Sequence, residues 1–323
     1  MSIRRVLLVG GAGFIGSHLA HALSARGVEL RIPTRRVERA RHLALLPTAD
    51  VVGADVSDPV ALDALSRDVD AVINLVGVLH SPEGVPYGPA FAQAHVDIAT
   101  RVAEAAKRNG VPRLLHVSAL GAAADAPSGY QRSKAAGEAA VRGAFGTAGL
   151  SILRPSVVFG PGDSFLRLFA QLARCLPVLP LAGAKTRFQP VYVGDVVAVM
   201  LRALDDATAQ GQCLTLAGPQ VYTLEELVDY AARQAGRPRR IIALPEGLAM
   251  LQARLMELAP APLMSRDNLR SLRQDNIAPG TPLPYGVTAT PLEAAAPRYL
   301  AEVSARAGYS PFRTRARRGE GWY

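Results

Sequence analysis

The chain has 323 residues, of which 49% are hydrophobic and 20% charged, so it can bury one large core or two modest ones. This composition excludes a disordered or fibrous protein, and no segment approaches the roughly 20 consecutive apolar residues of a membrane span. Lysine and arginine number 36 against 27 acidic residues, a net charge of +9 that favours anionic partners such as nucleotides, acidic lipid or an acidic protein. We expect a soluble protein and, because no nucleic-acid-binding motif accompanies the arginines, no nucleic-acid partner.

The start of the chain and its two cysteines indicate an intracellular location. Residues 1–16, MSIRRVLLVGGAGFIG, are basic and then apolar like a secretory signal, but glycines interrupt the apolar run and no small-residue cleavage site follows. Cys175 and Cys213 have neither metal-ligand spacing nor the density of a disulfide scaffold, and we expect both to be small buried hydrophobes. These features predict a cytoplasmic protein without a metal site.

Short apolar runs alternate with helical patterns through the first half of the chain. This order is typical of parallel strands joined by crossover helices, and it predicts a Rossmann-type α/β fold, a doubly wound parallel sheet with helices on both faces. The expected strands are 6–9, 29–32, 51–54, 71–76, 113–117 and 150–153, and the expected helices are 14–26, 58–66, 91–109 and 130–145.

Beyond Arg154, prolines mark irregular connections between shorter elements, and we expect a smaller C-terminal α/β lobe there. Strands are expected at 212–217 and 240–243, and helices at 223–235, 249–258, 266–273 and 292–307. The predicted division is a Rossmann domain at 1–165 with a returning segment at about 190–222, a smaller lobe at 166–189 and 223–310, and a basic tail at 311–323.

Three glycines, Gly10, Gly13 and Gly16, lie directly between the first strand and the first helix. A glycine in such a turn adopts backbone angles closed to other residues, a second lets the chain approach a pyrophosphate, and a third lets helix and strand pack closely. Free N–H groups at the start of the helix attract the anion. The position predicts a dinucleotide-binding turn, with a tight structural turn as the alternative.

The end of the second strand normally carries an acid that holds the ribose hydroxyls of NAD, but this sequence reads L-R-I-P-T-R-R there. Glu29 lies too early in the strand, whereas Arg31, Arg35 and Arg36 are suited to pair with a 2'-phosphate. The sequence therefore favours NADP(H) over NAD(H), unless these arginines form only a solvated surface run. Asp55, after the third strand, is placed to accept a hydrogen bond from an adenine amino group.

Tyr130 and Lys134 stand four residues apart, which places both on one face of the expected helix. A phenol is a poor base near neutrality, but a neighbouring ammonium stabilises the phenolate and brings proton transfer within range. Lys134 is also expected to hold the nicotinamide ribose. Ser118, at the end of the fifth strand, is placed to hydrogen-bond the same substrate oxygen. A relic of a cofactor site is the alternative to catalysis.

With these motifs the chain resembles the short-chain dehydrogenase/reductase superfamily, in its extended and atypical NAD(P)-binding branch. The resemblance rests on the segments 10–16, 55–56, 74–77, 118–119, 130–134 and 153–163. It implies that the segment after the sixth strand passes beside the nicotinamide. The cofactor-binding positions implied, besides the glycines, Arg35, Arg36 and Asp55, are Phe14, Ile15, Val56, Leu75, Val76, Gly77, Tyr130, Lys134, Pro155, Ser156 and Val157.

Two further segments, 188–196 and 265–276, are similar to the family of the nucleotide-binding accessory subunit of respiratory complex I. That similarity implies bound NADPH serving structure or assembly on the inner face of the respiratory membrane, without turnover. Tyr130 and Lys134 instead favour an oxidoreductase or epimerase that uses hydride transfer on an unidentified small molecule. Ser118 lies only twelve residues before Tyr130, which weighs against a nucleotide-sugar substrate. Both hypotheses stay open on the sequence.

Overall fold

The computed structural model describes residues 3–259 and 263–301. A seven-stranded sheet forms the centre of the first lobe, in the order β11-β6-β5-β4-β1-β2-β3, and every neighbouring pair is parallel. The strands are β1 (Arg5–Val9), β2 (Glu29–Thr34), β3 (Ala49–Gly53), β4 (Ala71–Asn74), β5 (Arg113–Val117), β6 (Leu150–Pro155) and β11 (Cys213–Leu216). The strand order reverses between β1 and β4, and sheets of this kind bind ligands at the carboxyl ends of the strands beside that reversal.

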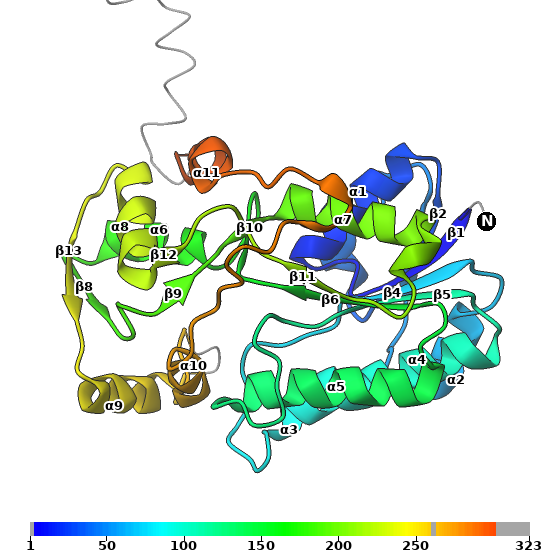
Figure 1. The fold of residues 1–323 in the computed structure, drawn as a ribbon, viewed down its shortest axis with the longest axis horizontal. Coiled ribbons are helices and arrows are strands. Elements are labelled where there is room, and N and C mark those ends of the chain that lie inside the picture. Colours follow the sequence, from blue (N-terminus) through cyan, green and yellow to red (C-terminus); the bar gives the residue numbers. More distant parts are fainter. Residues whose placement is uncertain (1–2, 260–262, 302–323) are drawn as a thin grey trace, which may run out of the picture.

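Helices cover both faces of the sheet (Figure 1). On one side lie α1 (Phe14–Ala25) and α7 (Val193–Asp205), and on the other α2 (Pro59–Leu65), α4 (Ile98–Arg108) and α5 (Gly129–Phe145). Val6 and Leu8 of β1 belong to the core that includes α1 and α7, while Leu7 and Val9 belong to the opposite core. A strand buried on both faces must be apolar at every position, which is why β1 shows no polar alternation. The predicted doubly wound fold is confirmed.

The second lobe packs α6 (Leu166–Cys175), α8 (Leu224–Gln234) and α11 (Leu292–Leu300) around a separate core that contains Phe159, Leu227 and Leu292. Its short strands form three pairs. These are β8 (Val178–Leu181) with β13 (Arg240–Ala243), β9 (Arg187–Phe188) with β12 (Tyr222–Thr223), and β7 (Val158–Phe159) with β10 (Val191–Tyr192). Two more helices, α9 (Glu246–Met256) and α10 (Arg266–Ser271), lie side by side on the side of the lobe opposite α11 (Figure 1).

Several element boundaries differ from those expected. The strand expected at 71–76 ends at Asn74, because the Asn74 side-chain oxygen accepts a hydrogen bond from the Val76 N–H at 3.1 Å and turns the chain. The helix expected at 91–109 is a short turn, α3 (Pro89–Phe91), then a π-helical segment, Ala92–Asp97, and then α4. Two helices, α6 and α7, lie where irregular connections were expected.

The cysteine prediction is wrong, because Cys175 and Cys213 are both exposed. Each stands at the end of an element, Cys175 as the last residue of α6 and Cys213 as the first of β11, so neither side chain reaches a core. The last part of the helix expected at 292–307 and the predicted basic tail at 311–323 lie outside the described residues.

Candidate functional site

The glycine turn joins β1 to α1 and lies against the loop after β4. Gly10 has a φ of 81°, and a Cβ there would lie 3.0 Å from the Leu75 carbonyl carbon. A Cβ on Gly16 would lie 2.6 Å from the Cα of Gly11, so the first turn of α1 sits directly on the loop. Gly13 is the N-cap of α1 and no side chain caps it, so the N–H groups of the first turn face outward without a side-chain acceptor. Phe14 and Ile15 open the helix.

The arginines in and after β2, Arg31, Arg35 and Arg36, are not equivalent. Arg31 donates from Nη1 to the carbonyls of Leu65 (2.6 Å) and Arg67 (3.1 Å), so the expectation that it pairs with a 2'-phosphate is wrong. Arg35 and Arg36 are exposed at the carboxyl end of β2. Arg35 and Arg36 are therefore the two arginines of this segment that remain candidates for pairing with a 2'-phosphate.

Asp55 and Val56 follow β3, beside these arginines. The Asp55 carboxylate accepts the Ser57 N–H at 2.9 Å, and this hydrogen bond, with help from the Arg35 charge, lowers the pKa of Asp55. Asp55 is exposed, and Val56 packs on the core under α2 and α4. An ionised, exposed acceptor is thus available beside Arg35.

The loop after β4 lies between the glycine turn and α5, the helix that carries Tyr130 and Lys134. Leu75 N–H donates to the Val9 carbonyl at 2.9 Å, which holds this loop beside the end of β1. A Cβ on Gly77 would lie 3.2 Å from Lys134 Nζ and 3.6 Å from His95 Nε2. The loop backbone therefore passes directly over the Lys134 ammonium, and a side chain at position 77 would crowd it.

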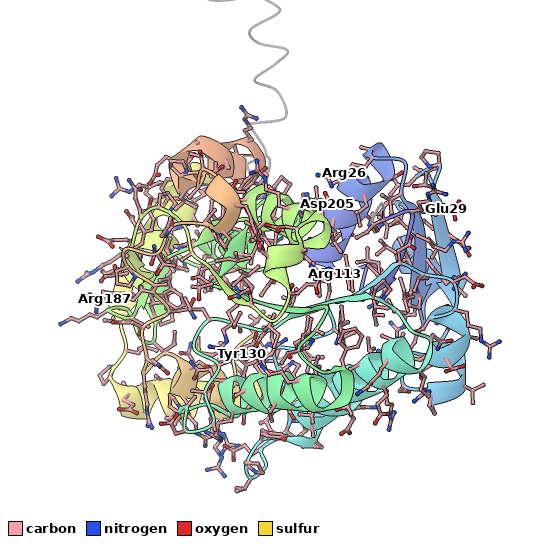
Figure 2. The ribbon with its side chains drawn as sticks, turned by 45° about the vertical axis from the view of Figure 1, so that its right-hand side comes forward. Arg26, Glu29, Arg113, Tyr130, Arg187 and Asp205 are labelled. Carbon is pink, nitrogen blue, oxygen red and sulfur yellow. The ribbon has the colours of Figure 1, made fainter. Side chains whose placement is uncertain are left out.

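The three predicted catalytic residues come from β5 and α5. Ser118 follows β5, and its hydroxyl is buried without a hydrogen-bond partner among the described residues. Lys134 Nζ donates to the carbonyl of Val117, the residue before Ser118, at 3.3 Å. Tyr130 lies in the first turn of α5, at the end nearest the small lobe (Figure 2). The structure therefore brings the lysine to the end of β5, with the tyrosine one turn away on the same helix.

Burial sets the charge state of the pair. It raises the pKa of Tyr130 to about 12, so the phenol keeps its proton at neutral pH. Burial also lowers the pKa of Lys134 to about 8, against the opposing charge of Glu138. The expectation that the ammonium lowers the phenol's pKa is therefore not met in this structure. A protonated phenol is a proton donor, so this state of the site is suited to general acid catalysis.

His95, in the π-helical segment, is a site residue that the sequence did not single out. Its Nε2 accepts the Val78 N–H at 3.0 Å, so the proton lies on Nδ1, which contacts Ser133 Oγ at 2.8 Å. Its ring meets the Tyr130 ring edge to face at a centroid distance of 5.4 Å. Burial, with the Lys134 charge next, lowers the pKa of His95 to about 2, so the ring is neutral.

His116 lies on β5 on the other side of this cluster. Its Nδ1 contacts Asn74 Nδ2 at 3.2 Å, and its Nε2 is buried without a partner among the described residues. Burial and the Lys134 charge lower its pKa to about 3. Two neutral imidazoles thus neighbour one buried ammonium, and neither compensates its charge.

Segment 265–276 of the second lobe closes the site from the other side. Ser156 Oγ donates to Asn276 Oδ1 at 2.6 Å, and Asn276 Nδ2 donates to the Leu120 carbonyl at 3.1 Å. Pro155 ends β6 and Val157 packs on the second core, so Ser156 stands between the two lobes. The Asn276 side chain therefore links the segment that follows β5 to the segment that follows β6.

Asp267, in the same segment, holds the start of α5. Its carboxylate oxygens accept the N–H groups of Gly129 (2.6 Å) and Tyr130 (2.9 Å). A carboxylate at a helix N-terminus satisfies otherwise unpaired donors and interacts favourably with the helix dipole. The backbone of Tyr130 is thereby positioned by the second lobe.

These features fit a nicotinamide dinucleotide. The glycine turn packs so closely that a Cβ on Gly10 or Gly16 would meet neighbouring backbone, and the first turn of α1 offers N–H groups for a pyrophosphate. After β5, the Ser118 hydroxyl lacks a partner within the described ranges. Within those ranges, no group of three or more His, Cys, Asp or Glu side chains is arranged to hold a metal ion.

Comparison with known proteins agrees with this geometry. Residues 6–217 match the NAD dependent epimerase/dehydratase family. The chain belongs to this family. A UDP-glucuronic acid 4-epimerase mutant from Bacillus cereus, solved with UDP-4-deoxy-4-fluoro-glucuronic acid and NAD, superimposes with a TM-score of 0.69 at 18% identity, covering 93% of this chain and 99% of the epimerase. At that identity the likeness shows the shared fold alone.

Two relatives are closer in sequence to this family member. NADH dehydrogenase [ubiquinone] 1 alpha subcomplex subunit 9 from Mus musculus is 34% identical over 294 residues, which cover 88% of this chain and 76% of the mouse protein. A ceramide reductase from Caulobacter vibrioides is 32% identical over 243 residues, which cover 75% of this chain and 74% of the reductase. The chain is thus similar both to a complex I subunit, as the segments 188–196 and 265–276 indicated, and to a reductase.

Proposed function

We propose that this protein is an NADP(H)-binding oxidoreductase or epimerase of the short-chain dehydrogenase type that acts on an unidentified small molecule. The observation that carries the proposal is the buried Ser118 hydroxyl without a partner in the described part of the chain, at the end of β5 beside a buried ammonium. A buried hydroxyl left unpaired costs free energy unless a ligand completes it.

In this proposal the turn at Gly10, Gly13 and Gly16 binds the pyrophosphate, and the residues after β4 and β6 follow the dinucleotide to its nicotinamide end. When bound, the dinucleotide supplies or accepts a hydride. Ser118 donates a hydrogen bond to the substrate oxygen, and the Tyr130 phenol, which is protonated at neutral pH, gives that oxygen a proton. Lys134 holds the ribose and provides a positive charge beside the reacting centre.

Replacing Tyr130 with phenylalanine tests this assignment. We expect NADPH oxidation against a panel of aldehydes and ketones to be lost, while NADPH affinity stays within about twofold, because the phenol is needed for proton transfer and not for pyrophosphate binding. Activity equal to that of the wild type in Tyr130→Phe would refute the role of Tyr130.

The NADP(H) preference rests on Arg35 and Arg36, because no carboxylate ends β2. We expect tighter binding of NADPH than of NADH, and loss of this preference in R35Q/R36Q. The matched control is R39Q/R41Q, which removes two exposed arginines from the next turn of the chain. Equal affinity of the wild type for both cofactors would contradict the preference.

A second candidate function is that of a non-catalytic NADPH-binding accessory or assembly subunit of respiratory complex I, with a cytoplasmic location on the inner face of the respiratory membrane. The similarity to the mouse subunit favours it. No helix in the described part of the chain is both long and apolar enough to cross a bilayer. Copurification of quinone-reductase subunits, together with no turnover by wild-type protein that binds NADPH, would support this function against the first.

A further inference from the structure

Helix α9 (Glu246–Met256) presents its larger apolar side chains to solvent. Leu248, Leu251 and Leu255 are 57%, 55% and 61% exposed, and Leu258, just after the helix, is 82% exposed. Their spacing of three and four residues places them on one face of the helix. An exposed apolar stripe of this kind on a soluble domain commonly marks an interaction surface.

The opposite face of α9 shows that this stripe is not a poorly covered core. Ala249 and Ala253 are the buried residues of the helix, and they pack with Ala182 and Leu269 in a small separate cluster. A surface helix normally turns its largest apolar side chains inward and its small or polar ones outward. Here α9 buries its alanines and exposes its leucines, so the leucine face has no partner within the described residues.

The charges around the leucine face are positive. Arg254, an exposed residue of α9 next to Leu255, forms no ion pair with the described residues. The acids of the same segment are neutralised, since Glu246 pairs with Arg273 and Glu257 pairs with Arg266 at 2.8 Å. The surface therefore combines apolar side chains with an unpaired arginine, which matches an anionic lipid bilayer.

Two other occupants fit less well. A second copy of the chain would bring the same arginine of each copy face to face, and like charges oppose association. The C-terminal residues 302–323 contain no leucine or isoleucine but carry five arginines, Arg306, Arg313, Arg315, Arg317 and Arg318. They follow α11, which lies on the opposite side of the lobe from α9 (Figure 1).

We propose that the leucine face of α9 docks this protein on the surface of an anionic membrane, with Leu248, Leu251, Leu255 and Leu258 in the interfacial region and Arg254 against lipid phosphates. The docked helix is connected to the predicted catalytic helix. Glu257, just after α9, accepts the Arg266 N–H at 2.7 Å, and the next residue, Asp267, holds the N-terminus of α5. Docking through α9 thus places the start of α5 near the bilayer, where an amphiphilic substrate is accessible.

The test is cosedimentation of the full chain with vesicles. We expect binding to vesicles of equal parts phosphatidylcholine and phosphatidylglycerol, weaker binding to phosphatidylcholine alone, and a loss of about tenfold or more in the double variant L251Q/L255Q. Glutamine keeps the helix propensity of these positions. The matched control, L45Q/V60Q, removes two apolar side chains that are 85% and 75% exposed in the first lobe, and it should bind as the wild type does.

Three results would overturn the proposal. These are no binding to either vesicle, equal loss in both double variants, and a dimer in solution that L251Q/L255Q abolishes while vesicle binding persists. Thermal melting of each variant identifies any loss that comes from unfolding. Docking does not depend on turnover, so its failure would leave the proposed reaction to be judged by Tyr130→Phe alone.

Discussion

Replacing Lys134 with methionine is expected to stabilise the protein while abolishing its NADPH-dependent turnover. The Lys134 side chain lies in the core of the site, with the residue only 5% exposed. Its Nζ has one hydrogen bond within the described residues, to the Val117 carbonyl, and its neighbours His95 and His116 are neutral. Methionine has a similar length and no charge, so the substitution removes the desolvation penalty without leaving a large cavity.

The size of the effect follows from the pKa of Lys134. A fall from 10.5 to about 8 means that the buried charge costs the folded state roughly 3 kcal/mol below pH 8. Between pH 8 and 10.5 the unfolded chain holds this proton and the folded chain releases it, so the free energy of unfolding of the wild type rises with pH across that window. The advantage of methionine is therefore largest below pH 8 and disappears toward pH 10.5.

Urea denaturation of the wild type and Lys134→Met at about pH 7 and about pH 10 measures this difference. The control is Lys185→Met, which removes an exposed lysine and should change the free energy of unfolding by less than about 0.5 kcal/mol. If Lys134→Met were less stable than the wild type at the lower pH, the ammonium would be a net stabiliser and the reasoning from burial would be wrong.

Three other substitutions probe the parts of the site. Gly16→Ala should weaken NADPH binding by at least about tenfold, because its Cβ meets the Gly11 backbone. The control is Gly143→Ala, where nothing lies within 4 Å of the added Cβ, and it should bind NADPH normally. Equal affinities of the two variants would contradict the close packing of α1 on the glycine turn. Arg154→Met should lower the free energy of unfolding, measured by urea denaturation, by about 3 kcal/mol, because it leaves the buried Glu138 carboxylate without its arginine. Arg233→Met breaks an exposed ion pair and should lower the free energy of unfolding by less than about 1 kcal/mol. Similar losses in the two variants would argue against burial as the cause. Asp267→Asn should cost about 1 kcal/mol of stability and lower kcat without changing NADPH affinity, and an unchanged kcat would show that this cap does not position Tyr130.

Local sequence patterns were sufficient to predict the parallel strands of the first lobe and most of the helices between them. The run from β1 through the glycine turn into α1 depends on neighbouring residues only, and its position in the chain could be read directly. The contacts of the Arg31 side chain could not be predicted in this way. Leu30 and Ile32 are buried on one face of β2, which turns Arg31 to the other face, where it meets carbonyls at the end of α2 more than thirty residues later. The sequence shows the alternation but not where α2 ends.

The residues that complete the site were missed for the same reason. Asn276 and Asp267 act on Ser156 and on the start of α5 from more than a hundred residues away. His95 stands in an apolar helical stretch that gives no signal of its own. The π-helical segment presses the His95 carbonyl toward α5, where a Cβ on Gly137 would lie 2.1 Å from it. Only the packing of α5 against this segment identifies His95 and Gly137 as part of the site.

The two candidate functions use the buried Lys134 differently, because only the enzyme needs its charge for a reaction. A cofactor-stabilised accessory subunit needs a firm fold, and the ammonium weakens the fold at neutral pH because burial penalises its charge more than the nearby Glu138 carboxylate favours it. An enzyme needs a cation beside the reacting oxygen and a proton on Tyr130. Burial favours the protonated phenol, and although it lowers the pKa of Lys134, the ammonium still carries its charge below about pH 8. Groups that cost stability in this way are characteristic of active sites. A proton donor and a buried cation in one site are what the proposed reaction needs, and the turnover of Tyr130→Phe tests that reaction against a purely structural role.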